Sequence, residues 1–242
     1  PSGEVVDGNP ELDGGTVYED ALPATLQDYW RDLEAHLIVA PDGARFSPVH
    51  LPPRWRDGTL TGKESWPDDT LDSVIASKVV AAYQSEFTWD DDGHRVPIGP
   101  DNRAQLQGTI LLRAPSTSAQ PLCATFESSA FLRTADFHTA SFAADTSFRK
   151  CLFEDTASFD SASFPMSVDF EHALFFQPST FVEVTFAWVN FSDAVFFAYV
   201  HFNRSTFENA LFFTTLFKED HEFSGASFHE AIFKSAFFEE AI

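Results

Sequence analysis

The chain has 242 residues, and its 37 Asp and Glu exceed its 15 Lys and Arg, giving a formal net charge of −22. Acidic residues outnumber basic ones by 20 to 9 in residues 1–114 and by 17 to 6 in residues 115–242, so both halves are acidic. This balance disfavours direct binding to nucleic acid or to an anionic membrane. No apolar run approaches the ~20 residues of a membrane span and no signal peptide opens the chain, which favours a cytoplasmic location.

The first part of the chain is predicted to contain a tail, helices and loops. Residues 1–22 are rich in Gly, Asp and Glu, and we expect a disordered acidic tail. The region 23–104 is predicted to be mainly helical, with amphipathic helices over 24–38 and 71–87. Their apolar stripes contain Leu26, Tyr29, Trp30, Leu33 and Leu37, and Leu71, Val74, Ile75, Val79 and Tyr83. Trp55 and Trp66 are expected to anchor the loops between the helices. Residues 105–121 form a predicted lead-in strand and loop, the strand containing Leu106, Ile110 and Leu112.

Phenylalanine then recurs every five or six residues. It occupies positions 126, 131, 137, 142, 148, 153, 159, 164, 170, 175, 181, 186, 191, 196, 202, 207, 212, 217, 223, 228, 233 and 238. An amphipathic helix would repeat near 3.6 residues and a half-buried strand at 2. A fixed period of another length is typical of a solenoid, whose repeats bury their apolar residues only against neighbouring repeats. Four steps sum to 21 or 22 residues, so four short sides make one coil.

Stacked coils would arrange these rings in four columns. The columns begin at positions 137, 142, 126 and 131 and are called first to fourth in that order. Two residues before each ring the side chain is nearly always small, which leaves room for a stacked ring beside it at interior packing density. Examples are Ala135, Ala140, Thr146, Cys151, Ala157, Ala162, Val168 and Ala173, and His221 is the exception.

These repeats resemble the pentapeptide-repeat family, whose units centre on Leu or Phe with a small residue two positions earlier. The resemblance is carried by units such as Thr134–His138 (TADFH), Thr139–Ala143 (TASFA) and Gly225–His229 (GASFH). It implies an all-β solenoid over residues 122–242, a right-handed quadrilateral β-helix with four pentapeptides per turn. This chain departs from the family pattern because its centres are uniformly Phe and some sides are one residue longer.

The longer sides are interpreted as corner bulges, which re-aim the chain locally. The step from the fourth column to the first is six residues throughout. The step from the second to the third is six at 142–148 and 164–170 and five from 186 onward.

Other sequence features are interpreted structurally. Cys123 and Cys151 are expected to be buried thiols, since two cysteines make no disulfide framework. Because the chain starts at Pro1, has Met166 as its only methionine and stops at Ile242 without a polar cap, we expect a piece of a longer protein.

An apolar ridge is predicted on the outside of the fourth column. The residue before each ring should face outward, and here these residues are apolar, with further rings beside them. In the double-phenylalanine pairs the inward ring is ambiguous by one residue, but one ring of each pair still faces outward. The candidate interface is Leu152, Leu174, Phe176, Val195, Phe197, Leu216 and Phe237. Such a ridge on a polar rod marks an interface. The N-terminal helices, a partner protein or a second copy could cover it, whereas membrane contact is disfavoured by the lack of a basic cluster.

No motif for catalysis, a metal or a cofactor stands out. The run Asp90–His94 lacks the alternating ligands and closing Glu of a calcium loop, and we interpret it as a solvated turn. His221 is either a switch or ligand in an inward position or, as we favour, a satisfied core histidine.

Three functions are consistent with this surface. The favoured hypothesis is a non-catalytic protein-interaction scaffold. The alternative is an acidic DNA mimic acting on DNA gyrase or another DNA-binding protein, which the family resemblance and the acidic charge suggest but which needs a continuous negative track. The third is an ice or crystal-surface binder, suggested by the hydroxyl row Ser141, Ser163, Thr185, Thr206 and Ser227.

Overall fold

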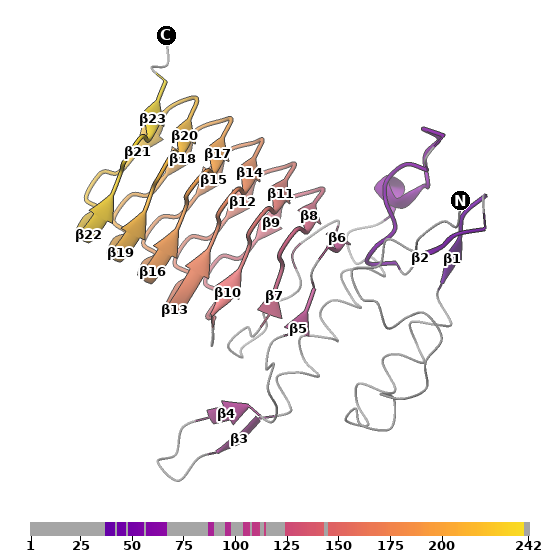
Figure 1. The fold of residues 1–242 in the computed structure, drawn as a ribbon, viewed down its shortest axis with the longest axis horizontal. Helices are drawn as coiled ribbons and strands as arrows, with labels where there is room; N and C mark the ends of the chain where they lie inside the picture. The colour runs from indigo at the N-terminus through magenta and orange to yellow at the C-terminus, as the bar shows by residue number, and fades with distance from the viewer. Residues whose placement is uncertain are drawn as a thin grey trace.

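A computed structural model describes most of the repeat region and parts of the N-terminal region. The described residues are 37–41, 43–46, 48–55, 57–66, 87–89, 95–97, 104–106, 108–111, 114, 124–142 and 145–239. The expected all-β solenoid is confirmed, because successive coils stack their strands in parallel (Figure 1).

Three parallel sheets run the length of the stack. The seven-stranded sheet contains β6 (Ile110–Leu111), β8 (Ala130–Phe131), β11 (Leu152–Phe153), β14 (Leu174–Phe175), β17 (Val195–Phe196), β20 (Leu216–Phe217) and β23 (Phe237–Phe238). A short-strand sheet contains β9 (Ala135–Asp136), β12 (Ala157–Ser158), β15 (Ser179–Thr180), β18 (Val200–His201) and β21 (His221–Glu222). A long-strand sheet contains β10 (Thr146–Ser147), β13 (Ser163–Asp169), β16 (Thr185–Asn190), β19 (Thr206–Leu211) and β22 (Ser227–Ile232).

The four predicted columns of phenylalanine rings fill the interior. Within a column, successive ring centroids lie 4.4 to 5.4 Å apart and the ring planes differ by 2° to 19°. Rings of different columns meet edge to face, as Phe159 and Phe170 do at 5.4 Å and 87°. From Phe126 to Phe217 every column ring is at most 1% exposed. The solenoid is therefore a closed rod of rings.

Several small inward side chains also form hydrogen bonds that connect successive coils. The Ser129 hydroxyl donates to the Leu106 carbonyl at 2.6 Å, and the Thr215 hydroxyl donates to the Phe191 carbonyl at 2.8 Å. Ser205 donates in the same way to Phe181. The limited space beside each ring explains why these inward residues are small. The hydrogen bonds explain why some of them are Ser or Thr. A buried hydroxyl must find a partner, and the carbonyl one coil earlier supplies it.

Two of the four corners are tight turns with a left-handed residue. After each ring of the first and third columns, the residue two positions later has a positive φ, between 55° and 60° at ten non-glycine positions. These are Ser128, Thr139, Lys150, Ser161, His172, Glu183, Asp193, Arg204, Thr214 and Ser235. In most of these turns the ring residue's carbonyl accepts from the N–H three residues on, as from Ala162 to Phe159 at 2.9 Å. This is type II turn geometry, which favours glycine at that position.

The predicted bulge is found at one corner, whereas the bulge predicted at a second corner is wrong. Between β13 and β16 the register shifts after Phe164, where Pro165 and Met166 lie opposite Ala187 alone. The equivalent step at 142–148 includes residues outside the described ones. The six-residue step from the fourth column to the first is no bulge, because the strands on both of its sides stay in register through every coil. It is a wider corner that all coils share.

The strand ladder begins one coil earlier than residue 122. Strand β5 (Ala104–Gln105) pairs in parallel with β7 (Ala124–Thr125), and β6 pairs with β8. Leu106 and Leu111 are 2% and 0% exposed and precede Phe126 and Phe131 in the third and fourth columns. The described residues of the expected lead-in strand thus belong to two sides of a further coil, whose centres are Leu in place of Phe.

Residues of the 37–66 segment pack against the start of this coil stack. Val49 belongs to the same buried cluster as Leu106 and Leu111. The Lys63 ammonium is fully buried, donates to the Pro48 carbonyl at 2.7 Å and lies 5.6 Å from the Trp66 ring centroid. Arg133 of the solenoid donates to the Trp66 carbonyl at 2.9 Å. These contacts join the 37–66 segment to the solenoid.

The expected helices 24–38 and 71–87 lie almost wholly outside the described residues. Their final residues are extended instead, since β1 is Ile38–Val39 and β3 is Phe87–Trp89. Each belongs to an antiparallel pair, β1 with β2 (Arg45–Phe46) and β3 with β4 (Arg95–Pro97). Within the described part of the chain the helical element is the short 3-10 helix Lys63–Ser65, so a mainly helical N-terminal segment is not found there.

We predict that Phe181→Ala lowers the free energy of unfolding by about 3–5 kcal/mol, because it opens a ring-sized gap in a closed column. The outward ring Phe197 provides the matched control, and Phe197→Ala should cost clearly less. Urea denaturation followed by circular dichroism measures both. Equal losses would show that the columns do not carry the stability.

We predict that Ser161→Gly raises the free energy of unfolding by about 0.5–1 kcal/mol, because glycine relieves the left-handed strain at an exposed turn. Ser158→Gly, in the extended strand β12, should lower it by about 0.5–1 kcal/mol. Thermal unfolding of the two variants beside the wild type tests the difference in sign. A destabilised Ser161→Gly would contradict the strain argument.

Candidate interaction surface

The outward row of the seven-stranded sheet is apolar through successive coils. Because side chains alternate across a strand, the residue before each buried ring points away from the core. Pairing aligns these residues directly across the coils. We call them the apolar stripe: Leu152, Leu174, Val195, Leu216 and Phe237. Four of them are half-buried and Phe237 is 66% exposed.

Two outward rings form a second row beside the stripe. Phe176 and Phe197 stack with centroids 4.8 Å apart and planes 5° apart, and we call them the outer ring pair. Phe176 is 39% exposed. The Lys218 ammonium, one coil further on, lies 4.9 Å from the Phe197 ring centroid, a cation–π contact. Five of the seven candidate residues therefore lie in strands of the seven-stranded sheet, and the other two, Phe176 and Phe197, directly follow such strands.

The double-phenylalanine positions are now assigned. Phe175 and Phe196 are 0% and 1% exposed and lie in the fourth column, so the rings after them face outward. Sequence alone left the centre ambiguous by one residue, because either ring of a pair can fill the same volume. Only the strand register decides which one lies inside.

Acidic residues border the stripe on the side of the outer ring pair. Glu154 and Glu239 occupy the same position in their coils as Phe176 and Phe197, and both are exposed. Glu219 follows Lys218 and is exposed, and Asp155 follows Glu154 and is half-buried. This edge carries four carboxylates and one ammonium among these residues, so it favours positive charge in whatever contacts it.

A second apolar group was not singled out from the sequence. Exposed side chains gather along the long-strand sheet and beyond it: Met166 at 51%, Trp188 at 36%, Ile232 at 52% and Phe213 at 40%. These residues do not share one register position, because the long strands run through a corner that carries a bulge. They form no continuous row like the stripe.

The hydroxyl row is in register, as expected. Ser141 to Ser227 pair coil by coil along the long-strand sheet. The row beside it is irregular, with Pro165, Ala187, Glu208 and His229 in successive coils, and the last two lie 3.3 Å apart as a potential ion pair. One regular row does not make the flat repeating lattice that a crystal surface would require.

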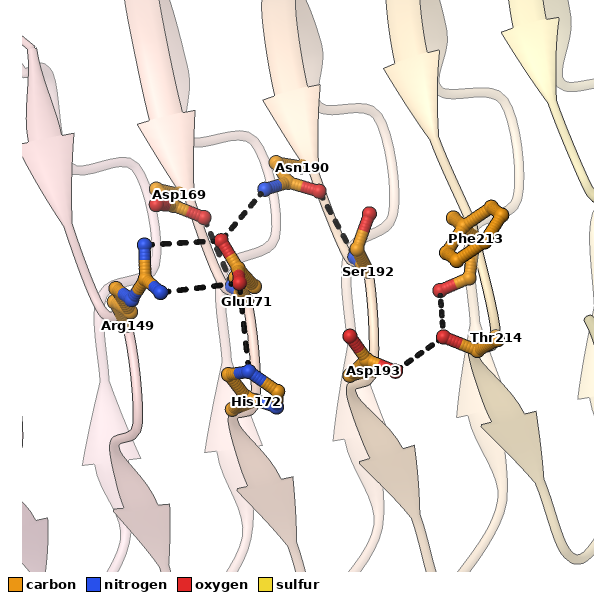
Figure 2. A network of polar contacts seen from close by, with 9 residues as sticks. All are labelled: Arg149, Asp169, Glu171, His172, Asn190, Ser192, Asp193, Phe213 and Thr214. Carbon is orange, nitrogen blue, oxygen red and sulfur yellow. Dashed lines mark hydrogen bonds and ion pairs between the residues drawn. The ribbon is translucent and has the colours of Figure 1, made fainter.

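A polar network crosses several coils near the third column (Figure 2). The Arg149 guanidinium contacts both carboxylate oxygens of Glu171, at 3.0 and 3.1 Å. His172 Nε2 lies 3.4 Å from the same carboxylate, and Thr214 donates to Asp193. Ligand atoms of Glu171, His172 and Asp193 lie within 4.8 Å of one another. Since Arg149 already pairs with both Glu171 oxygens, the network joins coils as a surface ion pair.

Carboxylates form no continuous track along the described coils. Between residues 124 and 239, no register position of the described coils carries Asp or Glu on two successive coils. In the short-strand sheet the outward row runs Asp136, Ser158, Thr180, His201 and Glu222. The negative charge is therefore distributed in patches.

Cys151 lies inside the rod. Its thiol is fully buried and donates to the Phe126 carbonyl at 2.8 Å, as Ser129 and Thr215 do in their own coils. Burial raises the pKa of this thiol far above its ordinary value, because the thiolate would lose its hydration. Cys151 is thus a structural residue.

The last described coil exposes its rings. Phe228, Phe233 and Phe238 are 37%, 37% and 43% exposed, and with Phe223 and His221 they line a shallow hollow. His221, the misfit in the inward row, is half-buried, and its ring lies 4.8 Å from that of Phe238. His221 thus lies in the last described coil, beside the partly exposed rings.

No helix among the described residues has the length and hydropathy needed to cross a membrane.

Coils of 21 or 22 residues with a phenylalanine ring every five or six residues define a pentapeptide-repeat β-solenoid. No protein-family model and no curated protein sequence matches the chain. Among solved structures, it is similar to HetL, a pentapeptide repeat protein involved in heterocyst differentiation regulation from the cyanobacterium Nostoc sp. strain PCC 7120. The identity is 12%, the TM-score is 0.11, and the match covers 55% of this chain and 86% of HetL. A likeness at this level says nothing about function.

We predict that Cys151 resists alkylation by iodoacetamide at pH 8 in the folded chain and reacts once the chain is unfolded in urea. Peptide mass spectrometry distinguishes it from Cys123. The thiol ionises in the unfolded chain above pH ~8.5 but stays protonated when folded, so stability should fall as the pH rises above that value. The variant Cys151→Ser has no thiol to ionise, so this part of the loss of stability at high pH should be absent. The serine hydroxyl should still donate a hydrogen bond to the Phe126 carbonyl. Rapid native labelling would contradict the buried position.

Proposed function

We propose that this chain is a non-catalytic protein-interaction scaffold, which presents the apolar stripe and the outer ring pair to a protein partner. The observation that carries the proposal is a straight apolar row on the outer face of a sheet, continued through five coils from Leu152 to Phe237. Contiguous apolar surface with a polar border is typical of an interaction site.

The interior supports a scaffold rather than an enzyme. Stacked rings fill the rod from Phe126 to Phe217, where an enzyme would need a cavity for its substrate. The best-connected polar cluster, around Glu171, lies on the surface and is held by Arg149. Function must then come from the outer faces.

Stacked coils also supply rigidity. Each inner strand of the seven-stranded sheet pairs with the coil before and after it, and β23 pairs with β20, so the stripe residues are held at fixed spacing. A partner that contacts the stripe would meet a preorganised row and would pay little entropy to order it.

DNA mimicry is less well supported. The net charge of −22 agrees with it, but the described coils carry their carboxylates in patches and interleave them with Arg149, Arg204 and Lys218. Duplex DNA presents one negative charge per ~1.7 Å of axis, which a patchy surface does not imitate.

The proposal is tested by comparing what the intact chain captures with and without the stripe. Wild type, the double variant Leu174→Lys/Val195→Lys and a control Thr185→Lys/Thr206→Lys should be immobilised and exposed to lysate of the source cells. The two variants add the same charge on different faces. Captured proteins are quantified by mass spectrometry, purified and titrated directly, and light scattering at ~100 μM measures self-association.

We expect at least one purified protein to bind wild type and control and to bind the stripe variant at least tenfold more weakly. The proposed function would be refuted if the chain is monomeric and the stripe variant captures the same proteins as the wild type. Circular dichroism of all three proteins verifies that they are folded.

A further inference from the structure

The shape of the stripe indicates what kind of partner element fits it. With strands ~4.8 Å apart, the five coils from Leu152 to Phe237 extend over about 19 Å. In the two coils that carry the outer ring pair, each ring is two residues after a stripe residue, about 7 Å along an extended chain, so with their side chains they form a band roughly 10 Å wide. The apolar surface is therefore long and narrow.

This area is too small for a stable dimer of two such faces. About 19 by 10 Å is on the order of 200 Å² per copy, against roughly 800 Å² per partner in a standard interface. Two copies would also bring together chains that each carry a net charge of −22. Like charge opposes association, so a second copy is disfavoured.

One α-helix matches the band in each dimension. A helix is ~10–12 Å in diameter with its side chains, and its turns repeat every ~5.4 Å, close to the ~4.8 Å strand spacing. About 13 residues of helix extend over 19 Å at ~1.5 Å per residue. Apolar side chains at i, i+3, i+4 and i+7 would then meet successive coils, which is a common way for helices to bind grooves.

The acidic edge of the band indicates which kind of helix can bind there. The edge beside the outer ring pair carries Glu154, Asp155, Glu219 and Glu239, with Lys218 directed onto the Phe197 ring. From these observations, and resting on the proposed function, we infer that the stripe binds an amphipathic helix of a partner protein whose polar edge is rich in Lys and Arg. The aromatic pair Phe176 and Phe197 would form the wall of the site, since large rings dominate binding energy.

A synthetic peptide tests this inference without knowledge of the natural partner. The probe is a fluorescein-labelled helix of about 18 residues, with Leu at i, i+3, i+4, i+7 and i+11 and Lys along one edge. Its anisotropy is followed as full-length chain is added at low and at physiological salt. The control probes are a scrambled peptide of the same composition and a peptide with Glu in place of Lys.

We expect micromolar binding of the basic helix, which Leu174→Lys and Val195→Lys each weaken at least tenfold. Thr185→Lys makes the same charge change on the hydroxyl row and should alter the affinity less than twofold. Glu154→Gln/Glu239→Gln should weaken binding severalfold at low salt and less at high salt, because screening already reduces that attraction. The acidic peptide should bind at least tenfold more weakly than the basic one.

Three results would overturn the inference. They are no binding up to ~1 mM, equal binding of the scrambled peptide, or no effect of the two stripe variants. If the capture experiment still yields a stripe-dependent partner, the scaffold proposal stands and only the helical form of the partner is wrong. If capture also yields nothing, both fail.

Discussion

Face-to-face stacking of phenylalanine rings in four columns is the constraint on which the rest of this structure depends. A ring that must lie on the ring one coil earlier fixes the length of every coil to within one residue. It also fixes the register of all three sheets, because a strand slipped by one residue would turn its ring to the outside. The offset from 22 to 21 residues per coil is absorbed at one corner by a single extra residue, because Pro165 and Met166 together lie opposite Ala187 alone. Elsewhere the columns continue unbroken.

The surface follows from the same constraint. When each ring points inward, the residues before and after it must point outward. Because successive coils are one strand spacing apart, these outward residues line up in rows along the solenoid. In one sheet that row is Leu, Leu, Val, Leu and Phe, in another it is mixed polar, and along the long strands it is Ser and Thr. A solenoid thus displays its sequence as parallel rows on rigid faces. Recognition by such a protein depends on which row is apolar, how wide it is and which charges border it.

The left-handed turns show where the fold works against local preference. Ten non-glycine residues adopt a conformation that ordinarily favours glycine, and each does so because the ring before it and the small residue after it are held by neighbouring coils. Cooperative packing supplies the energy that the local sequence lacks.

The sequence by itself determined the solenoid, the four columns, the small inward residues and an outward apolar row beside the fourth column. A side chain that recurs with a fixed period must face the same way in every coil, and that deduction needs no coordinates. Only the tertiary structure decided which ring of each double-phenylalanine pair lies inside, since either satisfies the same spacing. It also decided that Leu106 and Leu111 continue the third and fourth columns, because a column accepts any large apolar centre. The left-handed turns, the coupling of Cys151 to Phe126 and the cover that Val49 provides came from the structure alone. Each depends on contacts between residues about twenty or more positions apart, which no local pattern records.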